Sequence, residues 1–197
     1  LLREHYRCHP RIINFCNQKF YGEKLLIMTQ DNGEVDALCA FKTAPGNHAF
    51  DHYNQREIDV VKQEVLPILE GANDIGIISP YNHQISRFQE VLPDIEAATI
   101  HKYQGREKDI IILSVVDNKI STFADDPNLL NVAVSRAKKK FCLVVTGNEQ
   151  VTHGNISDLL DYISYNNCSV TESKVASIFD NLYEQYTKQR MDLLKGY

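Results

Sequence analysis

Two arginines lie in segments where a guanidinium could bind a phosphate group. Arg7 comes shortly before Pro10, and because proline keeps its predecessor extended, this segment leaves Arg7 room to reach outward. Arg136 continues the apolar helical face of Val132 and Ala133, so burial of that face would direct its charge along the domain surface. A guanidinium offers fixed, bidentate donors and stays charged. Each arginine therefore predicts an anion site, with an ordinary surface ion pair or an arginine stretched toward water as the alternative.

Two polar segments offer groups suited to a nucleic-acid strand. Ser79, Pro80 and Tyr81 follow a buried apolar run and precede a helical pattern, which places donors and an aromatic ring at a helix start. Thr99 and His101 offer side chains to a phosphodiester backbone. The alternatives are a strand-to-helix turn for the first segment and a plain polar connection for the second.

Gly105 and Glu107 belong to the second of these segments. The glycine allows close backbone approach, and the carboxylate could accept hydrogen bonds from a ribose hydroxyl, although a turn glycine in a polar loop explains the same letters. Other candidates are weaker. His48 and His52 lie in a polar loop without a further ligand pattern, so no metal site is predicted, and Cys8 is interpreted as a packing residue.

The elements that must position these residues alternate between strands and helices. Strands are predicted at residues 36–41, 75–79, 97–100, 109–116 and 141–146, and helices at residues 11–21, 54–69, 82–92 and 128–138. This alternation predicts an α/β, doubly wound, mostly parallel sheet with helices on both faces. Ligands of such sheets bind at the carboxyl ends of the strands, so we expect the polar segments to meet there.

Beyond Gly147 the pattern changes to helices only. One apolar stripe consists of Ile156, Leu159, Leu160 and Ile163, and a second of Val175, Ile178, Phe179, Leu182 and Tyr186. The sequence therefore predicts one domain over residues 1–148 and a helical extension, or a linker to a further domain, over residues 149–197.

Composition narrows the class of protein. Of 197 residues, 43% are hydrophobic and 24% charged, which is typical of a well-cored globular protein. The net charge of -5 argues against a generally basic nucleic-acid-coating protein but allows a local basic groove. No apolar run approaches the roughly 20 residues of a membrane span, so no membrane partner is expected.

Five scattered cysteines without a C-x-x-C pair indicate a reducing, cytoplasmic setting. Without an initiator Met or signal pattern, the chain is interpreted as a piece of a longer one.

Four motifs occur in order over residues 1–148. They are Tyr6-Arg7-x-His9-Pro10, Ser79-Pro80-Tyr81, Thr99-x5-Gly105-Arg106-Glu107 and Val132-Ala133-x-Ser135-Arg136-Ala137-Lys138. With these motifs in this order, the sequence resembles the second RecA-like domain of superfamily 1 helicases, in particular the subgroup of the nonsense-mediated-decay RNA helicase and its DNA-repair relatives. The departures are His5, where the family usually has Gln, and Cys8, where it usually has Met.

The resemblance implies a role for each matched residue. Arg7 and Arg136 would reach the γ-phosphate of ATP held by the first RecA-like domain. Tyr6 would lie near the base, while Gly105 and Glu107 would contact the nucleotide, Glu107 at the ribose. A track for single-stranded nucleic acid, with DNA slightly favoured over RNA, would be lined by Ser79, Pro80, Tyr81, Thr99 and His101.

The chain lacks the parts that hold ATP and Mg²⁺ in this family. It contains no G-x-x-x-x-G-K-[ST] motif and no apolar strand ending in an Asp-Glu pair. The resemblance therefore implies that ATP with Mg²⁺ is held mainly by a preceding RecA-like domain of the same chain, and that the 197-residue fragment alone is inactive. The alternatives are a non-enzymatic nucleic-acid-binding or docking module with a RecA-like fold, and a stand-alone nucleotide-binding domain. Arg7 and Arg136 distinguish the motor domain from the binding module, because a protein that only binds nucleic acid needs no pair of arginines directed at a phosphate.

Overall fold

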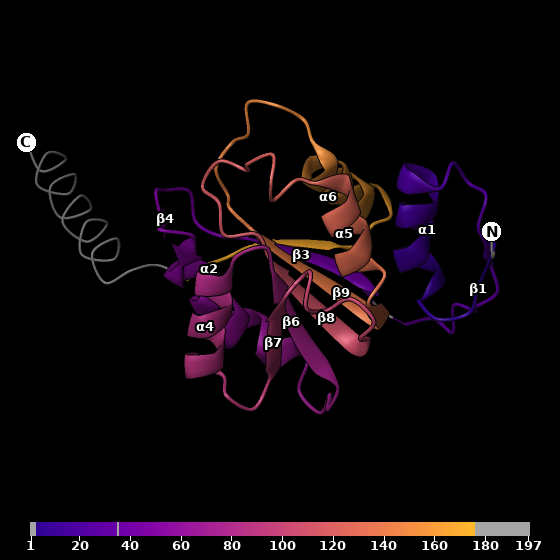
Figure 1. Ribbon diagram of the computed structural model, residues 1–197, viewed down its shortest axis with the longest axis horizontal. Helices are drawn as coiled ribbons and strands as arrows, with labels where there is room; N and C mark the ends of the chain where they lie inside the picture. The colour runs from indigo at the N-terminus through magenta and orange to yellow at the C-terminus, as the bar shows by residue number, and fades with distance from the viewer. Residues whose placement is uncertain (1–2, 35, 176–197) are drawn as a thin grey trace, which may run out of the picture.

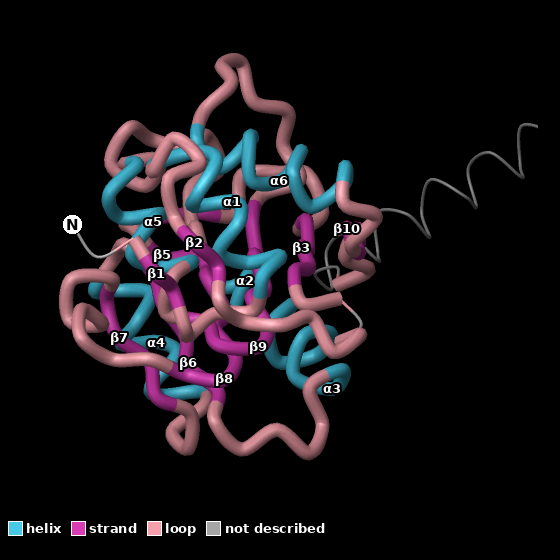
Figure 2. The backbone as a smooth tube through the Cα atoms, turned by 90° about the vertical axis from the view of Figure 1, so that its right-hand side faces the viewer, coloured by secondary structure: helices cyan, strands magenta, loops and turns pink. Residues whose placement is uncertain are grey.

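A parallel sheet of six strands forms the centre of the molecule, in a computed structural model that describes residues 3–34 and 36–175. Figure 2 shows the strands side by side. Every neighbouring pair in this sheet is parallel, so the mostly parallel sheet expected from the sequence is confirmed. The order across the sheet is β10 (Ser169–Glu172), β3 (Leu38–Lys42), β9 (Ala137–Val145), β8 (Lys108–Ser114), β6 (Ile75–Ser79) and β7 (Glu96–Thr99).

Helices cover both faces of the sheet (Figure 1). One face carries α1 (Pro10–Phe20), α5 (Pro127–Val134) and α6 (Asn155–Tyr165), which bury side chains such as Ile12, Leu130 and Ile156 against it. The other face carries α2 (Gln55–Val60), a π-helical turn (Val61–Val65), α3 (Leu66–Ile68) and α4 (Asn82–Val91), with Ile58 and Phe88 fully buried. The doubly wound, RecA-like α/β fold is therefore confirmed.

The helix expected at residues 128–138 ends earlier than predicted. It stops at Val134, and Ala137 already pairs with Lys108 as the first residue of β9. Apolar periodicity continues through this region, but strand pairing with β8 outweighs the local helical preference. Arg136 therefore lies in the short connection between α5 and β9, and its backbone oxygen accepts a hydrogen bond from the Lys108 amide at 3.1 Å.

After residue 148 the chain remains on the same sheet. The predicted helix is present as α6, with Ile156, Leu159 and Ile163 buried. The expectation of helices only is wrong, because β10 pairs in parallel with β3 at one edge of the sheet. β10 has only four residues and one apolar side chain, too short for a period-two pattern to show. A division of the chain at residue 148 stays a prediction, and the second stripe lies outside the described residues from Ile178 onward.

Two small sheets complete the fold. β1 (Glu4–His5) pairs with β2 (Leu26–Ile27) beside α1. β4 (Ala49–Phe50) and β5 (Tyr53–Asn54) form a hairpin within the segment expected as a loop. Its turn consists of Asp51 and His52, which both have positive φ, as a tight hairpin turn requires. Within residues 3–34 and 36–175, none of the helices has the length and apolar character needed to cross a membrane.

Candidate functional site

The residues singled out from the sequence fall at two opposite edges of the sheet. Ser79 and Thr99 end β6 and β7, at the carboxyl edge, as expected. Glu107 and Arg136 immediately precede β8 and β9, at the amino edge, and Arg7 lies beside Glu107, so the expectation that all polar segments meet at the carboxyl edge is wrong for these three residues. The reason is the topology: β7 and β8 both run parallel to β6, so residues 100–107 must return across the sheet before β8 begins.

Arg7 is placed at the amino edge by its neighbours in the chain. The Cys8 thiol is fully buried and donates to the Ser135 backbone oxygen at 3.3 Å. Burial raises the pKa of the Cys8 thiol to about 11, so this group stays protonated and acts in packing, as the sequence indicated. The His9 amide donates to the Lys138 oxygen at 2.7 Å. These two contacts fasten the Arg7 segment to the residues that flank Arg136.

Arg7 and Arg136 share a corner with a single nearby carboxylate. The Arg7 Nη1 atom lies 3.1 Å from Oε2 of Glu107, and both side chains are partly exposed. Among the residues that the structure describes, the Arg136 guanidinium donates only to neutral oxygens: Nε to Val132 O at 3.3 Å, Nη1 to Arg106 O at 3.4 Å and Nη2 to the Ser135 hydroxyl at 3.5 Å.

The corner carries more positive than negative charge. Within the described part of the chain, no carboxylate lies within 4.0 Å of the Arg136 guanidinium. Burial, and then the positive charge of Arg7, lower the pKa of Arg136. Two guanidiniums that repel each other across one carboxylate form a site that an anion would stabilise. We call Arg7, Glu107 and Arg136 the arginine corner.

Tyr6 and Gly105 lie on the segments that lead into the arginine corner. The Tyr6 side chain is 64% exposed, and its hydroxyl donates to Glu4 at 2.6 Å, which leaves the ring open to a planar ligand. Gly105 has φ +85° and is exposed, and the next amide, that of Arg106, donates to Tyr103 O at 3.0 Å. A glycine is suited to this turn because a side chain would be strained at that φ.

At the carboxyl edge, most of the side chains singled out from the sequence are covered by other residues. Ser79, Pro80 and Tyr81 are buried. The Tyr81 ring stacks on His52, with ring centroids 4.5 Å apart, and Phe123 packs on it at 5.6 Å. Burial raises the pKa of the Tyr81 hydroxyl to about 12.

His52 and Phe123 are candidate contact residues that sequence reasoning missed. His52 is exposed, and the Phe123 side chain is 46% exposed, so these two rings are the surface of the aromatic stack. Both come from loops far from Tyr81 in the sequence, and no local pattern could have associated them with it. The positive φ turn that holds His52 becomes visible only in the hairpin.

A polar groove of about 410 Å³ lies beside β7, the edge strand of the sheet. Thr99 lines the groove, and His101, two residues further along the chain, is exposed. Its hydroxyl, amide and positively charged side chains could each donate to a phosphodiester backbone. These side chains belong to Asn82, Ser86, Gln89, Thr99, Lys102 and Arg106.

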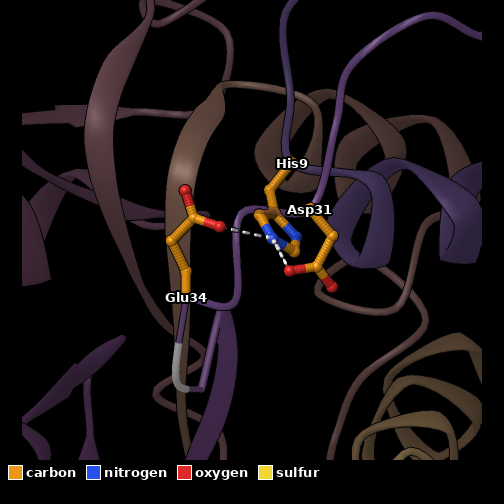
Figure 3. Close-up of side chains that lie close together, drawn as sticks. All are labelled: His9, Asp31 and Glu34. Carbon is orange, nitrogen blue, oxygen red and sulfur yellow. Dashed lines mark ion pairs between the residues drawn. The ribbon is translucent and has the colours of Figure 1, made fainter.

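One group of side chains in the described residues has a metal-like arrangement (Figure 3). The buried His9 ring points Nε2 at Asp31 Oδ1, 3.4 Å away, and at Glu34 Oε2, 3.3 Å away. The other ring nitrogen, Nδ1, accepts from the Arg11 amide at 3.2 Å, so the proton of the neutral ring lies on Nε2, facing the carboxylates. A metal at Nε2 would move that proton to Nδ1 and break the Arg11 contact. The group is better described as a polar contact between the Asp31 and Glu34 carboxylates and His9, the residue that precedes α1.

Comparison with known proteins identifies the family of the chain. A family model described as an AAA domain matches residues 1–150. The chain is 40% identical over 111 residues to the DNA polymerase alpha-associated DNA helicase A of Saccharomyces cerevisiae, covering 50% of this chain and 16% of that protein. It is 30% identical over 179 residues to an uncharacterized ATP-dependent helicase of Methanocaldococcus jannaschii, covering 77% of this chain and 27% of that protein.

Two further similarities extend over most of the chain. The regulator of nonsense transcripts 1 homolog of Neurospora crassa is 40% identical over 189 residues, covering 76% of this chain and 17% of that protein. A solved structure, the C-terminal domain of a possible DNA helicase from Lactobacillus plantarum, has a similar fold, with a TM-score of 0.55 at 16% identity, covering 85% of this chain and 99% of that one. The chain thus spans less than a third of the length of these curated relatives. It belongs to the AAA-domain family of superfamily 1 helicases.

Proposed function

We propose that this chain is the second RecA-like motor domain of an ATP-dependent helicase or translocase. In this proposal Arg7 and Arg136 bind the γ-phosphate of ATP held by a preceding domain, and the carboxyl edge forms part of a single-strand track. The observation that carries the proposal is the arginine corner. Arg136 is held by neutral oxygens alone, beside a second arginine, which is an arrangement that an incoming phosphate would complete.

The residues of the corner fit a polyphosphate but not its metal. Arg7 and Arg136 offer paired donors to phosphate oxygens. The single carboxylate, Glu107, is already engaged by Arg7 at 3.1 Å and has Lys138 Nζ at 4.0 Å, so it is not a spare ligand for Mg²⁺. We therefore assign Mg²⁺ to the preceding domain. ATP, when bound, would supply the phosphoryl group whose transfer to water drives the cycle.

The two arginines would act differently. Arg136 is already oriented by three acceptors, so it can meet negative charge without rearranging. Arg7 would have to exchange Glu107 for a phosphate oxygen. That exchange would free the Glu107 carboxylate to accept from a ribose hydroxyl. Arginines that reach a transferring phosphate from a neighbouring domain contribute about 10³–10⁵ in rate, so hydrolysis would depend on closure of the two domains.

The single-strand track is assigned to the groove beside β7 and to the aromatic stack of His52, Tyr81 and Phe123. The groove offers Thr99 and Lys102 as phosphate donors, and the exposed face of Phe123 offers a surface on which a base can stack. Residues 99–107 join the groove to the arginine corner. This continuity supports a coupling between strand binding and ATP hydrolysis.

The proposal is tested in the full-length protein by Arg136→Ala and Arg7→Ala. We expect either substitution to reduce nucleic-acid-stimulated ATPase activity by at least about 10³-fold, with little change in single-strand affinity. The matched control is Arg11→Ala, because Arg11 lies in the same segment and is already paired with Asp31 at 3.1 Å. Unchanged turnover in both test variants would remove Arg7 and Arg136 from the catalytic role, whereas strand binding without ATPase activity in the parent protein would favour the non-enzymatic binding module.

A further inference from the structure

Glu57 is a buried carboxylate that neither candidate site uses. It lies on α2, on the opposite face of the sheet from α1, and none of its surface is exposed. Its carboxylate accepts from the Ser114 hydroxyl at 2.6 Å, and each of its oxygens lies 3.0 Å from the Val116 amide nitrogen. Burying a carboxylate is costly, and these hydrogen bonds offset part of that cost.

The groups around Glu57 offer donors rather than acceptors. Ser114 already accepts from Gln84 Nε2 at 2.9 Å, so its proton is directed at Glu57. The Val116 amide can only donate. An uncharged amide in place of the carboxylate would put an N–H group against one of these donors, so the site is built for a carboxylate with both oxygens available.

The residue that Glu57 holds has a strained backbone. Val116, directly after β8, has φ +79°, a left-handed conformation that is unfavourable for a β-branched residue. Its amide is bound by Glu57, and its carbonyl oxygen accepts from Asn54 Nδ2 at 2.9 Å. Such a conformation persists only where surrounding contacts impose it, and here one contact holds the peptide group before Val116 and the other holds the peptide group after it.

The turn at Val116 determines where the chain goes next. Asp117 follows, and its Oδ2 accepts from the Tyr81 hydroxyl and from the Ser121 amide, each at 3.0 Å. Tyr81 in turn supports His52 and Phe123, the exposed rings of the aromatic stack. A chain of direct contacts therefore leads from the buried carboxylate to the surface of the carboxyl edge.

We propose that Glu57 is a positioning residue for single-strand binding: it holds the left-handed turn at Val116, which places Asp117 against Tyr81 and so orients the aromatic stack. This inference rests on the proposed function, because it assigns the carboxyl edge to a nucleic-acid strand. It predicts that Glu57 affects binding of the strand and leaves the arginine corner unaffected.

The test uses the full-length protein with Glu57→Gln, an isosteric change, and Asp59→Asn as the matched control on the same helix. In the amide, one of the two oxygens is replaced by an N–H donor, so either the Ser114 hydroxyl or the Val116 amide loses its acceptor, a loss of about tenfold in equilibrium terms. We expect about a tenfold higher oligothymidylate or oligouridylate concentration for half-maximal ATPase stimulation, with kcat at saturating strand within about twofold of the parent. Hydrogen exchange of residues 116–121 should accelerate by a similar factor, with the other strands unchanged.

A second substitution separates positioning from general stability. Glycine adopts positive φ without strain, so Val116→Gly should make the turn less dependent on Glu57. In the Val116→Gly background, Glu57→Gln should change the half-saturating strand concentration by less than about threefold, a non-additive result.

Three outcomes overturn the inference. They are an unchanged half-saturating concentration in Glu57→Gln, equal effects in both backgrounds, and faster exchange throughout the sheet instead of in residues 116–121. A parent protein without strand-stimulated ATPase would contradict the proposed function instead. In that case the exchange of residues 116–121 still decides whether Glu57 holds the turn.

Discussion

Replacing Tyr103 with phenylalanine should make the domain more stable. Tyr103 lies in residues 100–107, the return segment between the two candidate sites, and its side chain is fully buried in the core. Its hydroxyl is among the buried polar atoms that have no hydrogen-bond partner within the described residues. A buried hydroxyl without a partner costs about 1–3 kcal/mol, because it has lost its hydrogen bonds to water.

The size of the expected effect follows from the packing. Tyr103→Phe removes the unpaired oxygen and leaves a gap of one atom, so the net gain should be about 1–2 kcal/mol. For a domain of this length, that corresponds to a rise in Tm of roughly 3–6 °C. The assay is thermal and urea unfolding of the purified domain, followed by far-UV circular dichroism.

A matched control and a partner substitution sharpen the test. The Tyr162 hydroxyl donates to Arg11 O at 3.0 Å, so Tyr162→Phe should lower stability by about 1 kcal/mol. A Cβ atom at Gly76 would lie 1.9 Å from the Tyr103 hydroxyl, so Gly76→Ala should be strongly destabilising, and less so when combined with Tyr103→Phe. A lower Tm for Tyr103→Phe would show that the hydroxyl has a partner, and would refute the proposed packing of the return segment.

Three further measurements test other features of the domain. Burial raises the pKa of Glu57 to about 8, hydrogen bonds from Ser114 and Val116 lower it, and the charge of Asp117 raises it. Because the folded pKa lies above the ordinary 4.5, the folded state takes up the proton more readily, and stability should fall as pH rises between about 4.5 and 8, by up to about 1.4 kcal/mol per pH unit. Urea unfolding at several pH values checks this, and a slope that persists in Glu57→Gln would contradict it. Asp126→Ala should lower stability by about 1 kcal/mol in thermal unfolding, because its carboxylate caps α5 through two backbone amides; no change would mean that the cap contributes nothing. Phe123→Ala should weaken single-strand binding, measured by fluorescence anisotropy, by about 1–3 kcal/mol, whereas an unchanged Kd would remove the aromatic stack from the track.

The parts of the fold that depend on local pattern were predictable from the sequence. The apolar run that forms β8 and the Pro10 start of α1 were expected at nearly the observed positions, because continuous apolar runs and helix-starting prolines are local signals. β10 and the early end of α5 were not, because each depends on pairing with a strand that is distant in the sequence. Propensity cannot register such a partner.

For the candidate sites, residue types could be inferred but not their arrangement. Arg7, Glu107 and Arg136 were singled out, and the structure brings them to one corner. Their edge of the sheet was assigned wrongly, because the direction of the return segment is a property of the topology. Whether these residues bind nucleotide stays a prediction. The contribution of His52 and Phe123 to the aromatic stack could not be inferred, because their contacts with Tyr81 bring together segments that are far apart in the sequence.

The path of residues 99–107 has a mechanical consequence under the proposed function. The segment is anchored at Thr99, which pairs with Ser79 in the sheet, and at Lys108, which pairs with Ala137, and Tyr103 is packed between these points in the core. A tether that is fixed at both ends and in the middle cannot lengthen without unfolding. If the two sites bind as proposed, the span between the nucleotide end and the strand end of this domain would therefore stay constant throughout the cycle. The distance travelled along a nucleic acid for each ATP would then be set by how far the neighbouring domain moves, because the separation of the two sites on this domain would not change.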